Sequence, residues 1–296
     1  MSKAIGAYIL TESKGLAAGP LTVAASVVLR DRILFTALLV LTCHLVLAAT
    51  ADFITPYSPE AMSFSDILKP PSWAHWFGTD RYGRDVLART LFGGQITLAF
   101  GFGAVIVCLL IGLPVGLAAA YYGGWIDQLL MRVMDVLMSF PTVLLGLLIL
   151  IVAGPDLSTL ILAVGLVYSP RTTRVVRGAA LALRDAVFID AARARGERDT
   201  YIMLKEILPL CLGPIIVEVC IRLGYAILLG ASLNYLGLGV QPPAADWGSL
   251  IFEARPQMLQ APWTAFFPIL FISTLVASLH LVGDGIDAAL KGNYNG

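Results

Sequence analysis

The chain has 296 residues, of which 58% are hydrophobic and 14% charged, and its mean hydropathy is +0.82. A water-soluble globule of this length does not carry so much apolar surface, so lipid as well as a protein core must cover these side chains. The formal net charge is zero, which gives no reason to expect nucleic acid as a partner. The cysteines form no CxxC pair and no histidine lies at metal-ligand spacing from them, so we expect no metal site.

Apolar runs recur six times along the chain. A spanning helix needs about 20 apolar residues, and a helix satisfies every backbone amide within lipid. The sequence therefore predicts an all-α integral membrane protein with six transmembrane helices. The fourth run is short, and we expect it to borrow one or two turns from the arginine-bearing stretch that follows. The expected spans are 33–54, 95–121, 129–152 with an interruption at Pro141, 157–168, 212–236 and 263–282.

Lysine and arginine are distributed unevenly between the two sides of this bundle. With six spans, both termini face one side, which holds the N-terminal tail (1–32), the C-terminal tail (289–296) and a basic loop (169–211) within the five-helix core 95–288. Cytoplasmic loops carry the excess of positive charge, so we expect both termini and the loop in the cytoplasm. The opposite side holds only Lys69, Arg81, Arg84, Arg89 and Arg255.

A long connection, residues 55–94, joins the first two spans on the expected periplasmic side and contains four prolines. Trp73 and Trp76 are placed to lie at the membrane interface, where tryptophan is enriched. After the turn-rich stretch FGTDRYGRD, we expect a short interfacial helix from Asp85. The simpler interpretation of this stretch is a belt that seals the bundle; the alternative is a ligand site.

Two short helices at an angle are predicted within the basic loop. Asp185 is placed to cap a helix over AVFIDAARAR (186–195), and Gly196 supplies the left-handed residue that ends it. Asp199 is placed to cap a second helix, which leads to Pro209 at the foot of the fifth span.

Small side chains form one face of the first of these helices. Ala191 and Ala192 would let another backbone approach closely, as a docking surface requires, and Arg193, Arg195 and Arg198 line the surrounding surface. A basic loop held against anionic lipid headgroups is the alternative, at about 1 kcal/mol per cation. That alternative does not predict the Ala-Ala-x3-Gly spacing.

The stretch DAARARGERDTYIMLKEILP (190–209) resembles the cytoplasmic loop signature of ABC importer permeases. FGTDRYGRDVLARTLFGG (77–94) resembles the same region of dipeptide, oligopeptide and nickel permeases of the C type, and YLGLGVQPPAADWG (235–248) belongs to the same resemblance. Asp190 stands where that family usually has Glu, and Glu206 stands where it often has Ile. The resemblance covers nearly the whole chain from Ile33 onward.

The resemblance implies a type I ABC importer permease fold in the bacterial inner membrane, working by alternating access. It implies contact with membrane lipid and with three kinds of protein: a homologous second permease, two ATP-binding subunits or domains, and an extracytoplasmic solute-binding protein. The solute would be a di- or oligopeptide, or a relative such as a nickel chelate. Residues that would couple this chain to the ATPase are Asp190, Ala191, Ala192, Arg193, Gly196 and Glu206.

The chain contains no GxxxxGK[ST] phosphate-binding loop. We therefore expect no enzymatic activity and no cofactor in this chain, with ATP and Mg²⁺ bound by the partner subunits. A secondary transporter driven by an ion gradient is the alternative, because its composition would be similar. Such a transporter should show internal repeats with paired broken helices, and no convincing repeat relates the two halves.

Two ionisable residues lie inside the fifth expected span. Glu218 and Arg222 are four residues apart, so they share one helix face and can pair, and charges at this depth usually face a cavity or a partner. One hypothesis is that Arg222 faces the translocation cavity and meets a substrate carboxylate or the opposing permease, with Glu218 as its counter-ion. The other is a self-neutralised pair that locks the helix against its neighbours.

Overall fold

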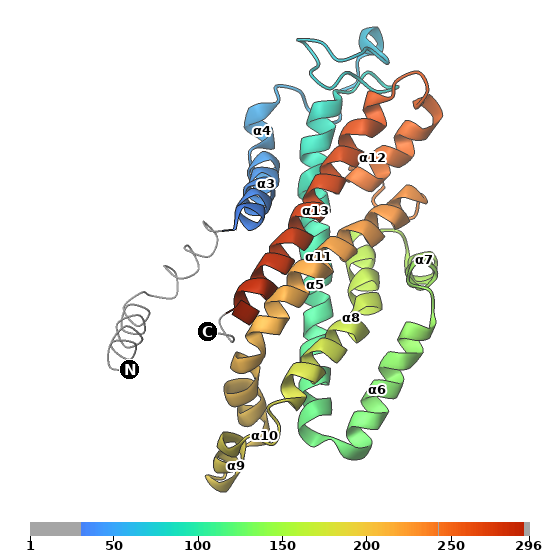
Figure 1. The fold of residues 1–296 in the computed structure, drawn as a ribbon. Coiled ribbons are helices and arrows are strands. Elements are labelled where there is room, and N and C mark those ends of the chain that lie inside the picture. Colours follow the sequence, from blue (N-terminus) through green and yellow to red (C-terminus); the bar gives the residue numbers. More distant parts are fainter. Residues whose placement is uncertain (1–30, 242, 293–296) are drawn as a thin grey trace, which may run out of the picture.

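The computed structural model describes residues 31–241 and 243–292. Apart from one isolated bridge between Thr79 and Asp85, every regular element in those ranges is helical. Long helices run side by side in an elongated bundle, with irregular chain at one end and the small helices α9 and α10 at the other (Figure 1). Almost all of the expected N-terminal tail, and residues 293–296 of the C-terminal tail, lie outside the described residues.

The first expected span consists of two helices, α3 (Arg32–Ala49) and α4 (Ala51–Ile54). Asp31 caps α3, because its carboxylate accepts hydrogen bonds from the backbone N–H groups of Ile33 and Leu34. The predicted start is therefore confirmed within a residue, and the helix is interrupted only at Thr50. Helix α3 packs chiefly against α13.

The second span is longer than the sequence predicts. Helix α5 (Val86–Tyr122) has 37 residues, and Asp85 caps it by accepting a 2.7 Å hydrogen bond from the N–H of Ala88. A helix does begin after Asp85, but the prediction that it is a separate short interfacial helix is wrong, because it is the first part of α5. The connection between the first two spans therefore ends at Asp85 and not at residue 94. Gly93 and Gly94 lie within the helix, where an added Cβ would come within 3.5 and 3.0 Å of the Trp247 indole.

The third expected span is broken into α6 (Gly124–Ser139) and α7 (Thr142–Ala153), which meet at 88°. Pro141 disfavours the helical conformation in the residue before it, and Phe140 is accordingly extended, with φ −86° and ψ 138°. The predicted interruption at Pro141 is confirmed, and it is a sharp bend between two helices.

Helix α8 (Leu157–Leu181) extends past residue 168 into the arginine-bearing stretch, as predicted, but by more than the one or two turns expected. Pro170 lacks the N–H that would bond to the Leu166 carbonyl, but the Ser169 hydroxyl donates to that oxygen at 2.9 Å, so the helix continues. The expected loop 169–211 therefore begins only at residue 182. We call residues 182–211 the coupling segment.

Helices α5 and α8 form the most extensive helix pair among the described residues. At Gly116, an added Cβ would lie 2.7 Å from the Thr173 carbonyl oxygen and 2.8 Å from the Val176 Cβ. Only a residue without a side chain allows this approach, which is the usual way in which membrane helices pack closely.

The last third of the chain contains α11 (Leu212–Tyr235), α12 (Trp247–Ala254) and α13 (Trp263–Gly292). Helix α12 was not predicted, because its eight residues are far fewer than the roughly 20 apolar residues that indicate a membrane-spanning helix. A reciprocal capping box between Asp246 and Ser249 begins it. Helix α13 continues past the expected end at residue 282.

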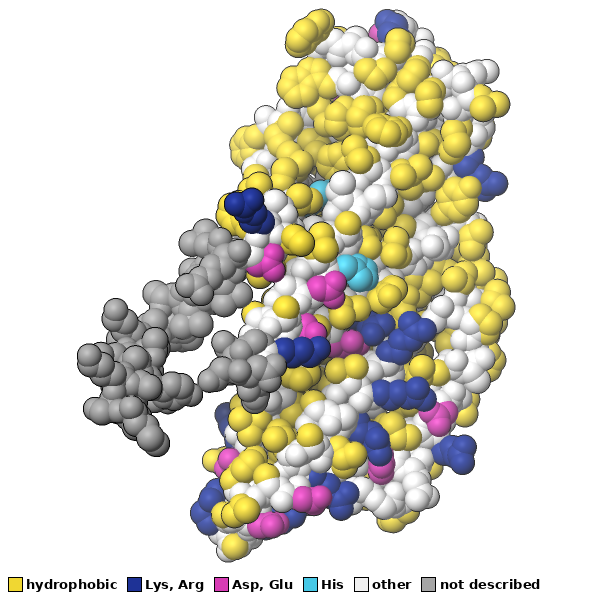
Figure 2. Space-filling view, in the orientation of Figure 1, with side chains coloured by type: hydrophobic (Ala, Val, Ile, Leu, Met, Phe, Trp, Pro, Cys, Tyr) yellow, Lys and Arg dark blue, Asp and Glu magenta, His cyan; other side chains and the backbone are white. Residues whose placement is uncertain are grey.

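Four helical runs in the described chain are long and apolar enough to cross a membrane, or five if the bent pair α6–α7 counts as one span. Helix α8 would be the sixth; its 25 residues are long enough, but arginines in its second half lower its hydropathy. The four runs are Arg32–Ala49, Val86–Tyr122, Asp199–Tyr235 and Trp263–Lys291. In Figure 2, hydrophobic side chains cover most of the upper part of the molecule and charged side chains gather towards the end that carries the coupling segment.

Candidate functional site: the coupling segment and the buried charges

Helix α9 (Val187–Ala194) is the first helix of the coupling segment, within a residue of its predicted ends. The prediction that Asp185 caps it is wrong: Ala186 is the capping residue, without a side-chain hydrogen bond, and the Asp185 side chain is 92% exposed. Gly196 ends the helix at φ +78°, as predicted. The N–H of Glu197 donates to the Ala192 carbonyl and the N–H of Gly196 to the Arg193 carbonyl, which is a Schellman motif.

The exposed face of α9 differs from the predicted small-residue face. Ala191 is exposed, but Ala192 is fully buried together with Ile189. The two alanines cannot lie on one surface, because neighbouring helix positions point about 100° apart. Val187, at 85% exposure, and Phe188 complete the exposed apolar face.

The second helix of the coupling segment leads without a break into α11. It begins as α10 (Asp199–Tyr201), passes through a π-helical turn (η2, Ile202–Ile207) and a 3₁₀ turn (η3, Leu208–Cys211), and joins α11 at residue 212. The wide turn precedes Pro209, whose nitrogen cannot donate to the carbonyl four residues earlier. Arg198 occupies the capping position, so the predicted cap at Asp199 is wrong by one residue.

Three ion pairs lie at the surface of this bend, and Arg195 takes part in two of them, one of which is with Glu197 at 3.7 Å. Asp190 pairs with Arg193 at 3.1 Å within α9, and Arg195 pairs with Glu206 at 3.3 Å across the bend. Exposed pairs of this kind contribute about 0–1 kcal/mol. Asp190 and Arg195 stay more than half exposed in these pairs.

The structure brings the intramembrane pair together. The Arg222 Nη2 and Nε atoms lie 2.6 and 2.9 Å from the Glu218 Oε1 atom, and both residues are buried. The Thr172 hydroxyl of α8 donates to the same oxygen at 2.9 Å. This arrangement joins α11 to α8, as the locking hypothesis expects.

Aromatic rings enclose the guanidinium of this pair. The Arg222 Cζ atom lies 5.2 Å from the Tyr168 ring centre and 5.7 Å from that of Tyr225. Its buried Nη1 atom has no hydrogen-bond partner among the described residues. Glu218 also borders a groove of about 560 Å³ whose walls come from α8, α11 and α13. Whether either residue faces the translocation pathway stays a prediction.

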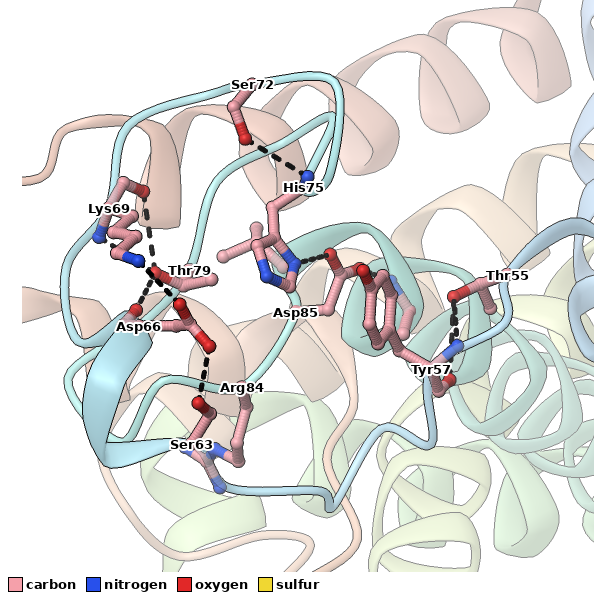
Figure 3. Close-up of polar contacts among 12 residues, drawn as sticks. Thr55, Tyr57, Ser63, Asp66, Lys69, Ser72, His75, Thr79, Arg84 and Asp85 are labelled. Carbon is pink, nitrogen blue, oxygen red and sulfur yellow. Dashed lines mark hydrogen bonds and ion pairs between the residues drawn. The ribbon is translucent and has the colours of Figure 1, made fainter.

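Residues 55–85, the first turn of α5 (86–89) and α12 form what we call the distal cap, at the end opposite the coupling segment. Figure 3 shows its polar contacts. The His75 Nδ1 atom lies 2.8 Å from the carboxylate of Asp85, the residue that caps α5. The Tyr57 ring lies beside the imidazole, with ring centres 4.7 Å apart and the ring planes tilted by 32°. Trp73 is 97% exposed, and its place at a membrane interface stays a prediction.

A buried group of four charged residues in the distal cap was missed by the sequence analysis. Arg84 donates to Asp80 at 2.7 Å, and Arg89 donates to Glu253 at 2.8 Å. Arg84 also pairs with Glu253, and Arg89 with Asp80, so each arginine contacts both acids. We call these residues the ion quartet. The arginines were visible in the sequence, but nothing local pointed to Glu253, which is 164 residues from Arg89.

The quartet fixes the charge of Glu253. Burial by itself would raise the pKa of this carboxyl group, but the hydrogen bonds and positive charges of Arg89 and Arg84 outweigh burial and hold the pKa below its ordinary value. A cavity of about 460 Å³ opens beside the quartet, with Arg81, Tyr82 and Phe252 in its wall.

Known proteins resemble this chain over most of its length. The dipeptide transport system permease protein of Alkalihalophilus pseudofirmus is 38% identical over 261 residues, which cover 88% of this chain and 86% of the relative. The glutathione transport system permease protein of Shigella dysenteriae is 41% identical over 268 residues, covering 90% and 88%.

A solved structure shares the fold. The MetNI methionine ABC transporter, in an inward-facing conformation, matches with a TM-score of 0.56 at 22% identity, over 69% of this chain and 96% of that one. A family model described as the binding-protein-dependent transport system inner membrane component matches residues 112–292, which include the coupling segment and the Glu218–Arg222 pair. The chain therefore belongs to the family of binding-protein-dependent transport system inner membrane components, as a permease subunit of an ABC importer.

Proposed function

We propose that this permease docks on a separate ATPase through α9 and that its solute is a short peptide. The observation that carries the docking assignment is the exposed apolar face of Val187, Phe188 and Ala191 at one end of the bundle (Figure 1). Exposure of such an apolar face to water is unfavourable in free energy, and burial in a groove of a partner protein would relieve it. Asp190 and Arg193 at its edge supply polar contacts.

In this proposal, the end that carries the coupling segment faces the cytoplasm, and both termini lie on the same side. The gathering of charged side chains at that end supports the orientation (Figure 2). A homologous second permease would complete the pathway, and two ATP-binding subunits would hold ATP and Mg²⁺. A binding protein would deliver solute at the distal cap, where the cavity beside the ion quartet opens.

The solute class follows from what the relatives are named for. One relative is a dipeptide permease and the other a glutathione permease, and glutathione is itself a short peptide with free carboxylates. Proteoliposomes that contain the assembled transporter should take up radiolabelled dialanine or glutathione only with ATP and the binding protein. Uptake driven by an ion gradient, without ATP, would instead support a secondary transporter.

The docking face can be tested at Ala191. Its replacement by tryptophan should prevent co-purification of the ATPase without loss of membrane insertion, because a bulky side chain blocks close approach. Ala244→Trp, at an exposed position in the distal half, is the matched control. Gly196→Pro should also reduce ATPase association, since proline fixes φ near −65° and the bend needs φ +78°. Normal association in both variants would contradict the assignment.

A further inference from the structure

Tyr121, in the last turn of α5, contacts both helices of the coupling segment. Its hydroxyl donates a 2.9 Å hydrogen bond to the Asp199 carboxylate at the start of α10. The Arg193 guanidinium of α9 lies 5.2 Å from the centre of the tyrosine ring. The tyrosine is only 7% exposed, whereas its partners Asp199 and Arg193 lie at the surface.

The hydrogen bond joins the ends of two long helices. Tyr121 is the penultimate residue of the helix Val86–Tyr122, and Asp199 is the first residue of the helical run Asp199–Tyr235, each of 37 residues. Both runs are candidate membrane spans. A displacement at this point would therefore act on the ends of two spanning helices together.

This bond also differs in kind from the other contacts of the coupling segment. Ile189 and Ala192 pack into an apolar cluster with Leu117 and Val176 of the bundle. Apolar packing has no preferred direction, whereas a hydrogen bond fixes the distance and angle between its partners. The 2.9 Å bond from Tyr121 to Asp199 is such a directed contact between the coupling segment and the rest of the molecule.

We infer that Tyr121 is the positioning residue through which the movement of the coupling segment reaches α5. Asp199 holds the tyrosine hydroxyl and Arg193 lies over its ring, so α9, α10 and the end of α5 shift as one unit. Without the bond, the ATPase still docks and hydrolyses ATP, but α5 follows the docking helix imperfectly. The inference rests on the proposed function, because it assigns a role in coupling to that same segment.

The test uses the assembled transporter in proteoliposomes, with radiolabelled dialanine or glutathione as solute. Tyr121→Phe removes one hydroxyl and keeps the ring beneath Arg193. Solute transported per ATP hydrolysed should fall by about tenfold, the factor for losing a charge-assisted hydrogen bond of ordinary strength. Tyr201→Phe is the matched control, since that tyrosine lies in the same segment, is exposed and makes no side-chain hydrogen bond within the described chain. The ATPase should co-purify with both variants.

A double-mutant cycle with Asp199→Ala, which removes the acceptor oxygen, tests the pair itself. The double variant Tyr121→Phe/Asp199→Ala should lose no more coupling than the worse single variant, because both changes remove the same bond. Additive losses, or an unchanged transport-to-ATP ratio in Tyr121→Phe, would overturn the inference. Loss of the ATPase from Tyr121→Phe would overturn it too, since the tyrosine would then serve docking.

One measurement does not depend on transport. In the purified permease, Tyr121→Phe should speed amide hydrogen exchange in residues 199–202, and Tyr201→Phe should leave it unchanged. Equal exchange in both variants would show that the bond does not hold the segment. If the wild-type transporter shows no ATP-dependent uptake, the proposed function fails, and the exchange result still decides whether the bond holds the segment.

Discussion

The two ends of the bundle use the same kinds of charged residue in opposite ways. In the distal cap, Arg84 and Arg89 meet Asp80 and Glu253 with little exposure to solvent; Arg89, for example, is 4% exposed. Taking such charges out of water is costly and is offset only when all partners are in place. The cap is therefore held in one arrangement.

At the other end, the ion pairs of the coupling segment lie in solvent. The side chains of Arg193 and Asp190 are 41% and 68% exposed, and Arg195, at 55%, pairs with the partly buried Glu206. Water screens these ion pairs, so they contribute little to the stability of the segment, and their charged groups stay available to a partner protein. The comparison indicates a fixed distal cap and a coupling segment whose polar groups remain free to bind.

The largest expected effect comes from breaking the ion quartet. Arg89→Met leaves two buried carboxylates with one arginine, and should lower the free energy of unfolding by about 3–5 kcal/mol. The thermal unfolding midpoint of the purified permease measures this. Arg255→Met is the control, because that arginine is exposed. Equal midpoints for the two variants would show that the quartet does not hold the cap.

A smaller effect is expected in the apolar core beneath α9. Ala192→Leu inserts bulk at a fully buried position, and such overpacking typically costs about 1–3 kcal/mol. Ala191→Leu, one residue away and exposed, should leave the unfolding midpoint unchanged. A midpoint that falls for Ala191→Leu and not for Ala192→Leu would reverse the orientation of the helix described above.

Acid should weaken the distal cap by less than these substitutions. The folded-state pKa of Glu253 lies below its ordinary value of 4.5, so its contribution to stability is present above that value and is lost as the pH falls through the lowered pKa. The unfolding midpoint, followed from pH 7 downwards, should therefore drop below about pH 4.5. In Glu253→Gln, the unfolding midpoint should fall less steeply with acid. If its pH profile equals that of the wild type, the Glu253 carboxyl group is not a source of the acid sensitivity.

The smallest expected effect is at the exposed pairs. Glu206→Gln removes one of the two carboxylates that pair with Arg195, the other being Glu197, and should change the free energy of unfolding by less than about 1 kcal/mol. Raising the salt concentration should erase even this difference. If Glu206→Gln lowered the free energy of unfolding as much as Arg89→Met, the exposed ion pairs would be what stabilises the coupling segment.

The sequence by itself determined the features that depend on local spacing. Apolar runs identified a helical membrane protein, and the Ala-Ala-x3-Gly pattern located the bend at Gly196, whose left-handed conformation is confirmed. The separation of Glu218 and Arg222 by four residues predicted their pairing, because one helical turn brings them to the same face.

Only the tertiary structure decided which side of each element is buried and which distant residues meet. Ala192 is buried because the end of α5 and the helix α8 lie behind it, and no local pattern contains those neighbours. Arg89 meets Glu253 because α12 folds back onto the start of α5. Helix periodicity is a property of a short segment, whereas these contacts depend on the packing of segments far apart in the chain.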